Sequence, residues 1–193
     1  MHKNRSALTV KILVYGALLA AMAVVLGRVT AIYPAPGMKY TLDKFVLFMS
    51  GMFLGPAVGS LVGFVADLAG GLLFGQGWFP QLCVPAVLYG LFGGIFQKLL
   101  IKKLNLPRLA LAYAFPVVIG SILYQSPVLA ATYSPTTFWE ATCAYLLSRS
   151  VQFSIMLVLE VVLIYVLIKT NIFTRIGMWP PVTLKKDRDN NDC

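Results

Sequence analysis

The chain has 193 residues, of which 59% are hydrophobic and 12% are charged, and its formal net charge is +9. Soluble domains carry about a quarter charged residues, and a mean hydropathy of +0.79 leaves too little polar surface to cover one soluble core. The basic residues fall in short clusters between apolar runs, which is typical of membrane-flanking charges and argues against nucleic-acid binding. The composition predicts a multi-pass α-helical membrane protein without a large soluble domain.

The N-terminal segment allows two interpretations. A basic stretch precedes an apolar run from Ile12 to Gly27, and Val29-Thr30-Ala31 resembles a cleavage site. This is the outline of a secretory signal peptide. Because several hydrophobic runs follow, we instead predict a retained first span over residues 9–27.

The next apolar run extends from Phe45 to Phe74 and contains Gly55-Pro56. As one helix it would be about 45 Å long, which exceeds the hydrocarbon core of about 30 Å. The Gly-Pro step is a natural break. We therefore predict two helices, over residues 43–54 and 56–74, of which the first is short for a span.

Three more apolar runs follow, and the six predicted spans form an all-α membrane bundle within residues 1–170. Residues 171–193 are predicted to be a polar cytoplasmic tail. The spans are 9–27, 43–54, 56–74, 84–100, 109–129 and 138–168.

The Lys and Arg residues orient these spans. Twelve of the sixteen lie in three clusters. With six spans, all three clusters face the cytoplasm, as the positive-inside rule requires, whereas five spans would place the middle cluster outside. Both termini are therefore predicted to be cytoplasmic, and the loops at 28–43, 75–83 and 130–137 extracellular. The clusters are Lys3, Arg5 and Lys11; Lys98, Lys102, Lys103 and Arg108; and Lys169, Arg175, Lys185, Lys186 and Arg188.

Several kinds of chemistry are missing from the sequence. His2 is its one histidine, which removes Ser–His and Cys–His catalysis and the usual zinc sites. There is no Walker A motif. Cys83, Cys143 and Cys193 are odd in number and widely spaced, so they predict neither a disulfide framework nor a metal site. We expect no enzyme activity, no metal and no cofactor.

Four of the charged residues within or at the ends of the predicted spans stand out as candidates: Arg28, Asp67, Arg149 and Glu160. Such residues are costly in a membrane and are usually functional. One interpretation is a ligand site. The alternative is an internal ion pair, for example of Asp67 with Arg28 or Arg149.

The predicted extracellular loops combine aromatic and basic side chains. Aromatic faces stack on flat rings, and arginine can fork onto a carboxylate, so the set suits an aromatic or amphipathic anion. The alternative is that the aromatic side chains only anchor the membrane interface. The predicted substrate-binding residues are Arg28, Tyr33, Lys39, Tyr40, Asp67, Trp78, Phe79, Gln81, Tyr124, Gln125 and Arg149.

Small residues recur at helical spacing on two spans. Gly55, Gly59 and Gly63 are four residues apart, as are Ala17 and Ala21. In membranes this spacing lets helix backbones approach closely. Internal bundle packing is the first interpretation of both ridges.

A set of local strings, in this order and spacing, resembles the substrate-binding S component of energy-coupling factor (ECF) vitamin transporters, and most closely the folate-type members. The resemblance covers most of residues 7–170 and includes six short helices with both ends inside. The strings are Ala17-Leu-Leu-Ala-Ala21 with Val25-Leu-Gly-Arg28, Gly51-Met-Phe-Leu-Gly-Pro56, Val65-Ala-Asp-Leu68, Gly77-Trp-Phe-Pro80 with Ala86-x-Leu-x-Gly90, and the Arg149 region.

Two departures from the folate-type pattern bear on the vitamin. The chain has Ser121-Ile-Leu-Tyr-Gln125 where folate members tend to carry an Asn-Thr-Leu-Trp-like stretch, and Gln81-Leu-Cys83 where many have Gly-Phe-Thr. Pantothenate, with one carboxylate and no ring, is the alternative to folate, with two carboxylates and a pterin. The aromatic side chains favour folate.

The resemblance implies a division of labour in the bacterial cytoplasmic membrane. This chain would bind the vitamin from outside, while an ECF transmembrane coupling subunit and two ABC ATPase subunits supply the energy. Ala17 and Ala21 would then form the surface that meets the coupling subunit rather than an internal contact.

Two other classes of function stay open. A stand-alone proton-coupled secondary transporter would use Asp67 or Glu160 as a proton relay, although no inverted repeat is evident in the sequence. The third hypothesis is a small structural membrane protein, but this role would not explain the polar residues of the predicted outer loops.

Overall fold

The computed structural model describes residues 2–32, 40–73, 80–102, 105–133 and 137–170. Within these ranges the chain is helical apart from short connections and one antiparallel bridge between Ile32 and Tyr40. This confirms the predicted all-α class. The helices are α1 (His2–Val29), α2 (Lys44–Leu54), α3 (Pro56–Leu73), α4 (Pro80–Ile95), α5 (Gln97–Lys102), α6 (Leu106–Pro116), the π-helix η1 (Val117–Tyr124), α7 (Gln125–Tyr133) and α8 (Phe138–Lys169).

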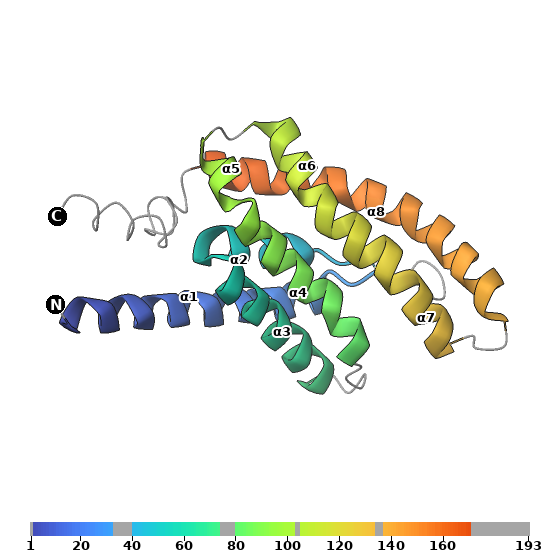
Figure 1. The fold of residues 1–193 in the computed structure, drawn as a ribbon, viewed down its shortest axis with the longest axis horizontal. Helices are drawn as coiled ribbons and strands as arrows, with labels where there is room; N and C mark the ends of the chain where they lie inside the picture. The colour runs from blue at the N-terminus through green and yellow to red at the C-terminus, as the bar shows by residue number, and fades with distance from the viewer. Residues whose placement is uncertain (1, 33–39, 74–79, 103–104, 134–136, 171–193) are drawn as a thin grey trace.

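These segments group into six rods in the described part of the chain. α6, η1 and α7 follow one another without a break over Leu106–Tyr133, and α5 continues from α4 after a turn at Phe96 (Figure 1). Within the described ranges, four helices are long and apolar enough to cross a membrane, whereas α2 and α4 are shorter. The four are Val10–Val29, Pro56–Leu73, Leu106–Tyr133 and Phe138–Lys169.

Several helices extend beyond the predicted spans. α1 begins at His2 rather than Thr9, and α4 begins at Pro80 rather than Val84. Hydropathy marks the apolar part of a helix, while the helical backbone continues through polar flanks, and a proline is well tolerated in a first turn. The membrane boundaries themselves stay predictions.

The break between α2 and α3 lies at Gly55. Its φ of 92° and ψ of 170° place it in a region that side-chain-bearing residues rarely adopt. The Gly55 N–H still donates to the Gly51 carbonyl at 2.8 Å, and Pro56 opens α3. The Gly-Pro step therefore turns the chain sharply, so that α2 and α3 pack against each other.

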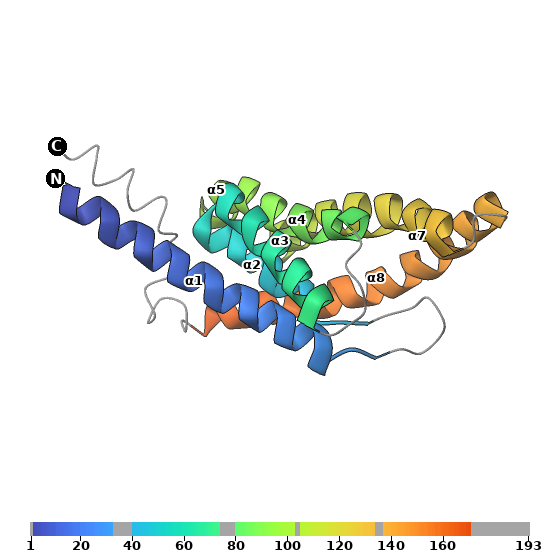
Figure 2. The same cartoon turned by 90° about the horizontal axis from the view of Figure 1, so that it is seen from below.

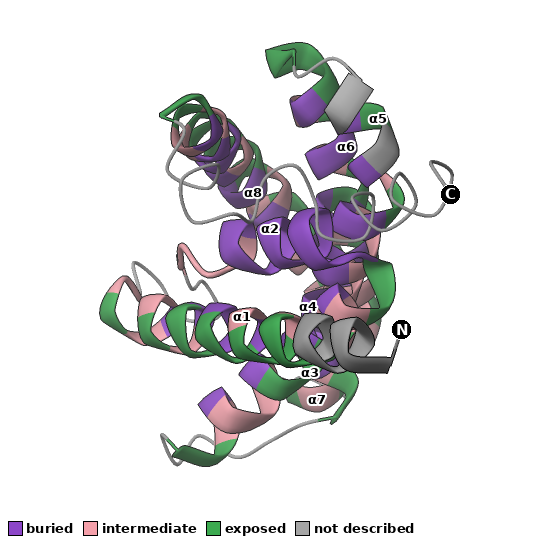
Figure 3. Ribbon diagram, turned by 90° about the vertical axis from the view of Figure 1, so that its left-hand side faces the viewer, coloured by how far each residue is buried: buried purple, intermediate pink, exposed green. Residues whose placement is uncertain are grey.

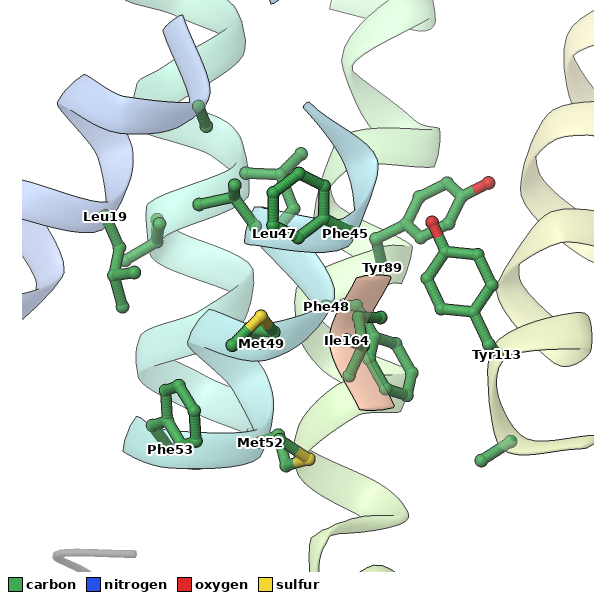
Figure 4. Packing of buried hydrophobic residues seen from close by; sticks show 14 of the residues in the cluster. Leu19, Phe45, Leu47, Phe48, Met49, Met52, Phe53, Tyr89, Tyr113 and Ile164 are labelled. Atoms are coloured by element: carbon green, nitrogen blue, oxygen red, sulfur yellow. The ribbon is translucent and has the colours of Figure 1, made fainter. Parts of the chain in front are cut away.

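The core is built around α2. Every residue from Phe45 to Leu54 is buried, and Figure 3 shows α2 as an almost uniformly buried helix in the middle of the bundle. The Phe48 ring meets the Tyr113 ring edge-on, with 5.0 Å between centroids (Figure 4). A helix that is apolar all round belongs inside a bundle. The short α2 is therefore enclosed by protein rather than by lipid.

Glycines let α2, α3 and α4 touch through their backbones. A methyl group added at Gly90 would overlap the Gly59 carbonyl, and one added at Gly59 would overlap the backbone of Gly51. At Gly63 it would overlap the Ala86 carbonyl. The predicted close packing thus joins α3 to α4 at Gly63, and α3 to both α2 and α4 at Gly59.

Different helix termini lie at the two ends of the bundle. α1 begins and α8 ends at the same end of the molecule (Figures 1 and 2). At the opposite end of the molecule, α7 ends close to the start of α8 (Figure 1). The cavity described next lies between these ends and is lined by the second half of α1, the start of α2 and the middle of α8.

Candidate functional site

A cavity of about 510 Å³ opens between α1, α2, α3, α4, α7 and α8. This volume lies within the range of about 300–1,000 Å³ that is usual for small-molecule sites. Six charged residues line it, three of each sign: Arg28, Lys44, Arg149, Asp43, Asp67 and Glu160.

Two of the cations are held by neighbouring groups of the protein. The Nη2 atom of Arg28 donates to the Gly70 carbonyl at 2.5 Å, which ties the end of α1 to α3. Lys44 Nζ lies 2.9 Å from Asp43 Oδ2 in a salt bridge at the start of α2. Both cations are therefore fixed at the cavity wall before a ligand arrives.

Arg149 is held differently. Its Nη1 donates to the Ser121 carbonyl at 3.1 Å, and the guanidinium lies over the Phe153 ring at 5.7 Å. The side chain is 7% exposed, and its Nε has no hydrogen-bond partner. Among the described residues, no carboxylate pairs with Arg149. A buried charge without a counter-charge is costly, so an anion that binds in the cavity beside Arg149 would be stabilised.

Ser121, which anchors Arg149, belongs to the π-helix η1. Wide π turns interrupt the regular α-helical pattern and are frequent at functional sites. The Ser121 Oγ also shares a hydrogen bond of 3.0 Å with the Tyr89 hydroxyl. This one residue thus joins α4, η1 and α8 behind the cavity.

Glu160 lies three helical turns further along α8. Its Oε2 accepts a hydrogen bond of 2.6 Å from the Tyr113 hydroxyl, and the residue is 2% exposed. Its Oε1 has no hydrogen-bond partner. The Tyr113 ring packs against the Tyr89 ring at 5.6 Å, so the carboxylate has a rigid aromatic support.

The structure brings some of the predicted substrate-binding residues together and not others. Three predicted residues do not line the cavity: Tyr40, Gln81 and Tyr124. Tyr40 is half-buried and pairs through its backbone with Ile32. Tyr124 is half-buried, and Gln81 is exposed. The predicted residues that line the cavity are Arg28, Asp67, Gln125 and Arg149. The predicted residues Tyr33, Lys39, Trp78 and Phe79 lie outside the described part of the chain.

Other lining residues were not in the predicted substrate-binding set, although Glu160 had been named as a charged candidate. They include Asp43, Lys44, Tyr133, Gln152, Phe153, Met156 and Glu160. A signal for the α8 members is present in the sequence, because positions 149, 152, 153, 156 and 160 follow helical spacing and share one face. Lys44 carries no such signal, since the hydropathy pattern shows it only as the polar start of an apolar helix.

Comparisons with known proteins agree on the class. A family model described as "ECF-type riboflavin transporter, S component" matches residues 7–169. A solved structure described as FolT bound with folic acid is similar, with 26% sequence identity and a TM-score of 0.66. The match covers 79% of this chain and 89% of that one. No curated protein matches.

The predicted resemblance to ECF S components is confirmed. Because that family consists of the substrate-binding components of membrane transporters, the chain is not an enzyme. The chain belongs to the family of ECF-type riboflavin transporter S components.

Proposed function

We propose that this chain is the high-affinity substrate-binding S component of an ECF-type vitamin importer and that its vitamin is folate. The observation that carries the proposal is the buried Arg149 guanidinium, which has no carboxylate partner among the described residues and lines a cavity of about 510 Å³. A buried arginine in this state favours a ligand that brings a carboxylate, since the fork geometry of arginine matches that group.

The chemistry of the candidate vitamins supports this choice. Folate carries two carboxylates and a flat ring system, whereas riboflavin carries no carboxylate and pantothenate carries no ring. Phe153 and Tyr133 provide aromatic faces at the same cavity as Arg28 and Arg149. The folic acid complex of the similar solved structure points the same way.

A ligand panel tests the vitamin. Purified protein should gain thermal stability with folate, because a ligand that binds only the folded state raises the melting temperature. At 100 times its Kd the gain in unfolding free energy is about 2.7 kcal/mol. Riboflavin and pantothenate at equal concentration should stabilise far less. Stabilisation by riboflavin or pantothenate but not by folate would contradict the choice of folate.

The partner surface in this proposal is the outer face of α1. Ala17 and Ala21 are both exposed, and they lie among larger exposed apolar side chains such as Leu13, Leu18 and Val25. Two alanines on an apolar helix face leave a shallow, flat strip that another transmembrane helix can approach closely. An ECF transmembrane coupling subunit would dock there and connect the chain to two ABC ATPase subunits, in the bacterial cytoplasmic membrane with both termini inside.

Replacing Ala17 and Ala21 together by Trp should leave folate binding unchanged and reduce folate uptake to background. The bulky rings would prevent the close helix approach without reaching the cavity, since neither residue lines it. Uptake of labelled folate in cells that also produce the coupling subunit and the two ATPases measures the effect. Ala144→Trp, at an exposed alanine of α8, is the matched control.

Two outcomes would count against this assignment. Normal uptake by the Ala17/Ala21 double variant would show that α1 is not the coupling surface. Proton-driven uptake in cells without the ATPases would instead support a stand-alone secondary transporter.

A further inference from the structure

The two ends of the cavity offer opposite hydrogen-bonding groups. At one end, the buried Nε of Arg149 is a donor without a partner. At the other end, Glu160 and Asp43 each have one carboxylate oxygen bound by the protein and one without a partner. All three residues line the cavity.

The acceptor end is built from two helices. Glu160 comes from α8 and Asp43 from the start of α2, where Asp43 packs beside Gly27. Asp43 and Lys44 lie close enough to Glu160 to interact with it electrostatically. Tyr113 occupies the Oε2 of Glu160, and Lys44 occupies the Oδ2 of Asp43. The Phe45 backbone and the Thr41 side chain also lie near these two groups. The protein thus holds both carboxyl groups in place, while the Oε1 atom of Glu160 and the Oδ1 atom of Asp43 have no hydrogen-bond partner.

The separation of the two ends matches an elongated ligand. Arg149 and Glu160 are three turns apart on one face of α8, or about 16 Å along the helix axis. Gln152, Phe153 and Met156 line the stretch between them. A ligand that satisfies both ends therefore carries an acidic group at one end and hydrogen-bond donors at the other.

We propose that Glu160 and Asp43 recognise a ring edge with neighbouring N–H donors, while Arg149 holds a carboxylate at the far end of the same ligand. This inference rests on the proposed function and adds the orientation of the vitamin and its selection. A buried acceptor that stays unsatisfied costs free energy, so a ligand that supplies N–H groups is preferred strongly over one that does not.

This arrangement discriminates between the vitamins. The amino-oxo-pyrimidine edge of a pterin presents an amino group beside a ring N–H, which gives adjacent donors for carboxylate oxygens. The corresponding edge of a flavin presents one N–H between two carbonyl oxygens. Those carbonyls would face the carboxylates of Glu160 and Asp43, and this repulsion rejects the flavin.

The test combines a ring-deletion ligand with variants of Glu160. Dissociation constants are measured for folate and for p-aminobenzoyl glutamate, which keeps both carboxylates but lacks the pterin. Glu160→Gln and Glu160→Leu should weaken folate binding about 10- to 100-fold, the usual range for a hydrogen bond to a charged group. Binding of p-aminobenzoyl glutamate should be unchanged, so the ratio of its dissociation constant to that of folate falls by the same factor.

A matched control and a second variant complete the experiment. Glu140→Gln, at an exposed glutamate in the first turn of α8, should change neither constant. Asp43→Asn should lower the same ratio as the Glu160 variants do. Melting temperatures without ligand check that each variant is folded.

The outcomes separate this inference from the proposed function. Equal weakening of both ligands, or no weakening of either, by folded Glu160 variants would overturn the inference while leaving folate as the vitamin. Failure of the unaltered protein to bind folate would overturn both.

Discussion

Replacing Arg149 by Gln should weaken folate binding by at least about 30-fold, the equivalent of roughly 2 kcal/mol, because truncating one member of a buried charge pair costs about 2–5 kcal/mol. The guanidinium is buried and is anchored by the Ser121 carbonyl and the Phe153 ring. It can therefore meet a carboxylate without first being desolvated or ordered. Equilibrium titration of the purified variant measures the loss.

Two further variants make this result specific. Arg149→Lys keeps the positive charge but loses the two-pronged geometry of the guanidinium, so its affinity for folate should lie between that of the unaltered protein and that of Arg149→Gln. Arg108→Gln removes an exposed arginine at the start of α6 and should leave affinity unchanged. An Arg149→Gln variant that binds folate with unaltered affinity would show that the carboxylate is held elsewhere.

Gly90→Ala should lower the melting temperature of the protein by about 6–12 °C, as expected from a packing cost of up to roughly 3 kcal/mol. The new methyl group would overlap the carbonyl carbon and oxygen of Gly59 and crowd the Ser60 nitrogen. These are backbone atoms and cannot move aside by rotating a side chain. The α3 and α4 backbones must separate instead.

Gly16→Ala is the matched control for this destabilisation. A methyl group there would meet Val62 Cγ2 at 3.4 Å and other side-chain atoms at 3.8 Å, which are ordinary contacts. Alanine also favours a helix over glycine by about 1 kcal/mol. Gly16→Ala should therefore melt at the same temperature as the unaltered protein or above it. Equal melting temperatures for Gly90→Ala and the unaltered protein would mean that the helices are less closely packed than described.

Much of the helical framework could be predicted from the sequence, because long apolar runs and the Gly55-Pro56 step are local signals. Hydropathy could not show that α2 is enclosed by protein, since a residue facing lipid and a residue facing the core are equally apolar. The π-helix η1 was also missed, because its residues continue an apolar run without a distinct pattern.

The candidate site was predicted in part. Arg28, Asp67 and Arg149 stand out because charges are rare in apolar runs, and each of them lines the cavity. The sequence does not show which residues these charged side chains contact, because their partners are distant along the chain. Tyr113 and Glu160 are 47 residues apart, and Arg149 and Ser121 are 28 apart, so only the packed bundle shows which of them meet.

Calorimetric titration of the purified chain with folate, without any coupling subunit or ATPase, tests whether this chain alone binds the vitamin. One folate should bind per chain with a Kd below about 1 µM, which corresponds to a binding free energy of roughly −8 kcal/mol or stronger. Binding of riboflavin in preference to folate, or no binding of folate at all, would contradict it.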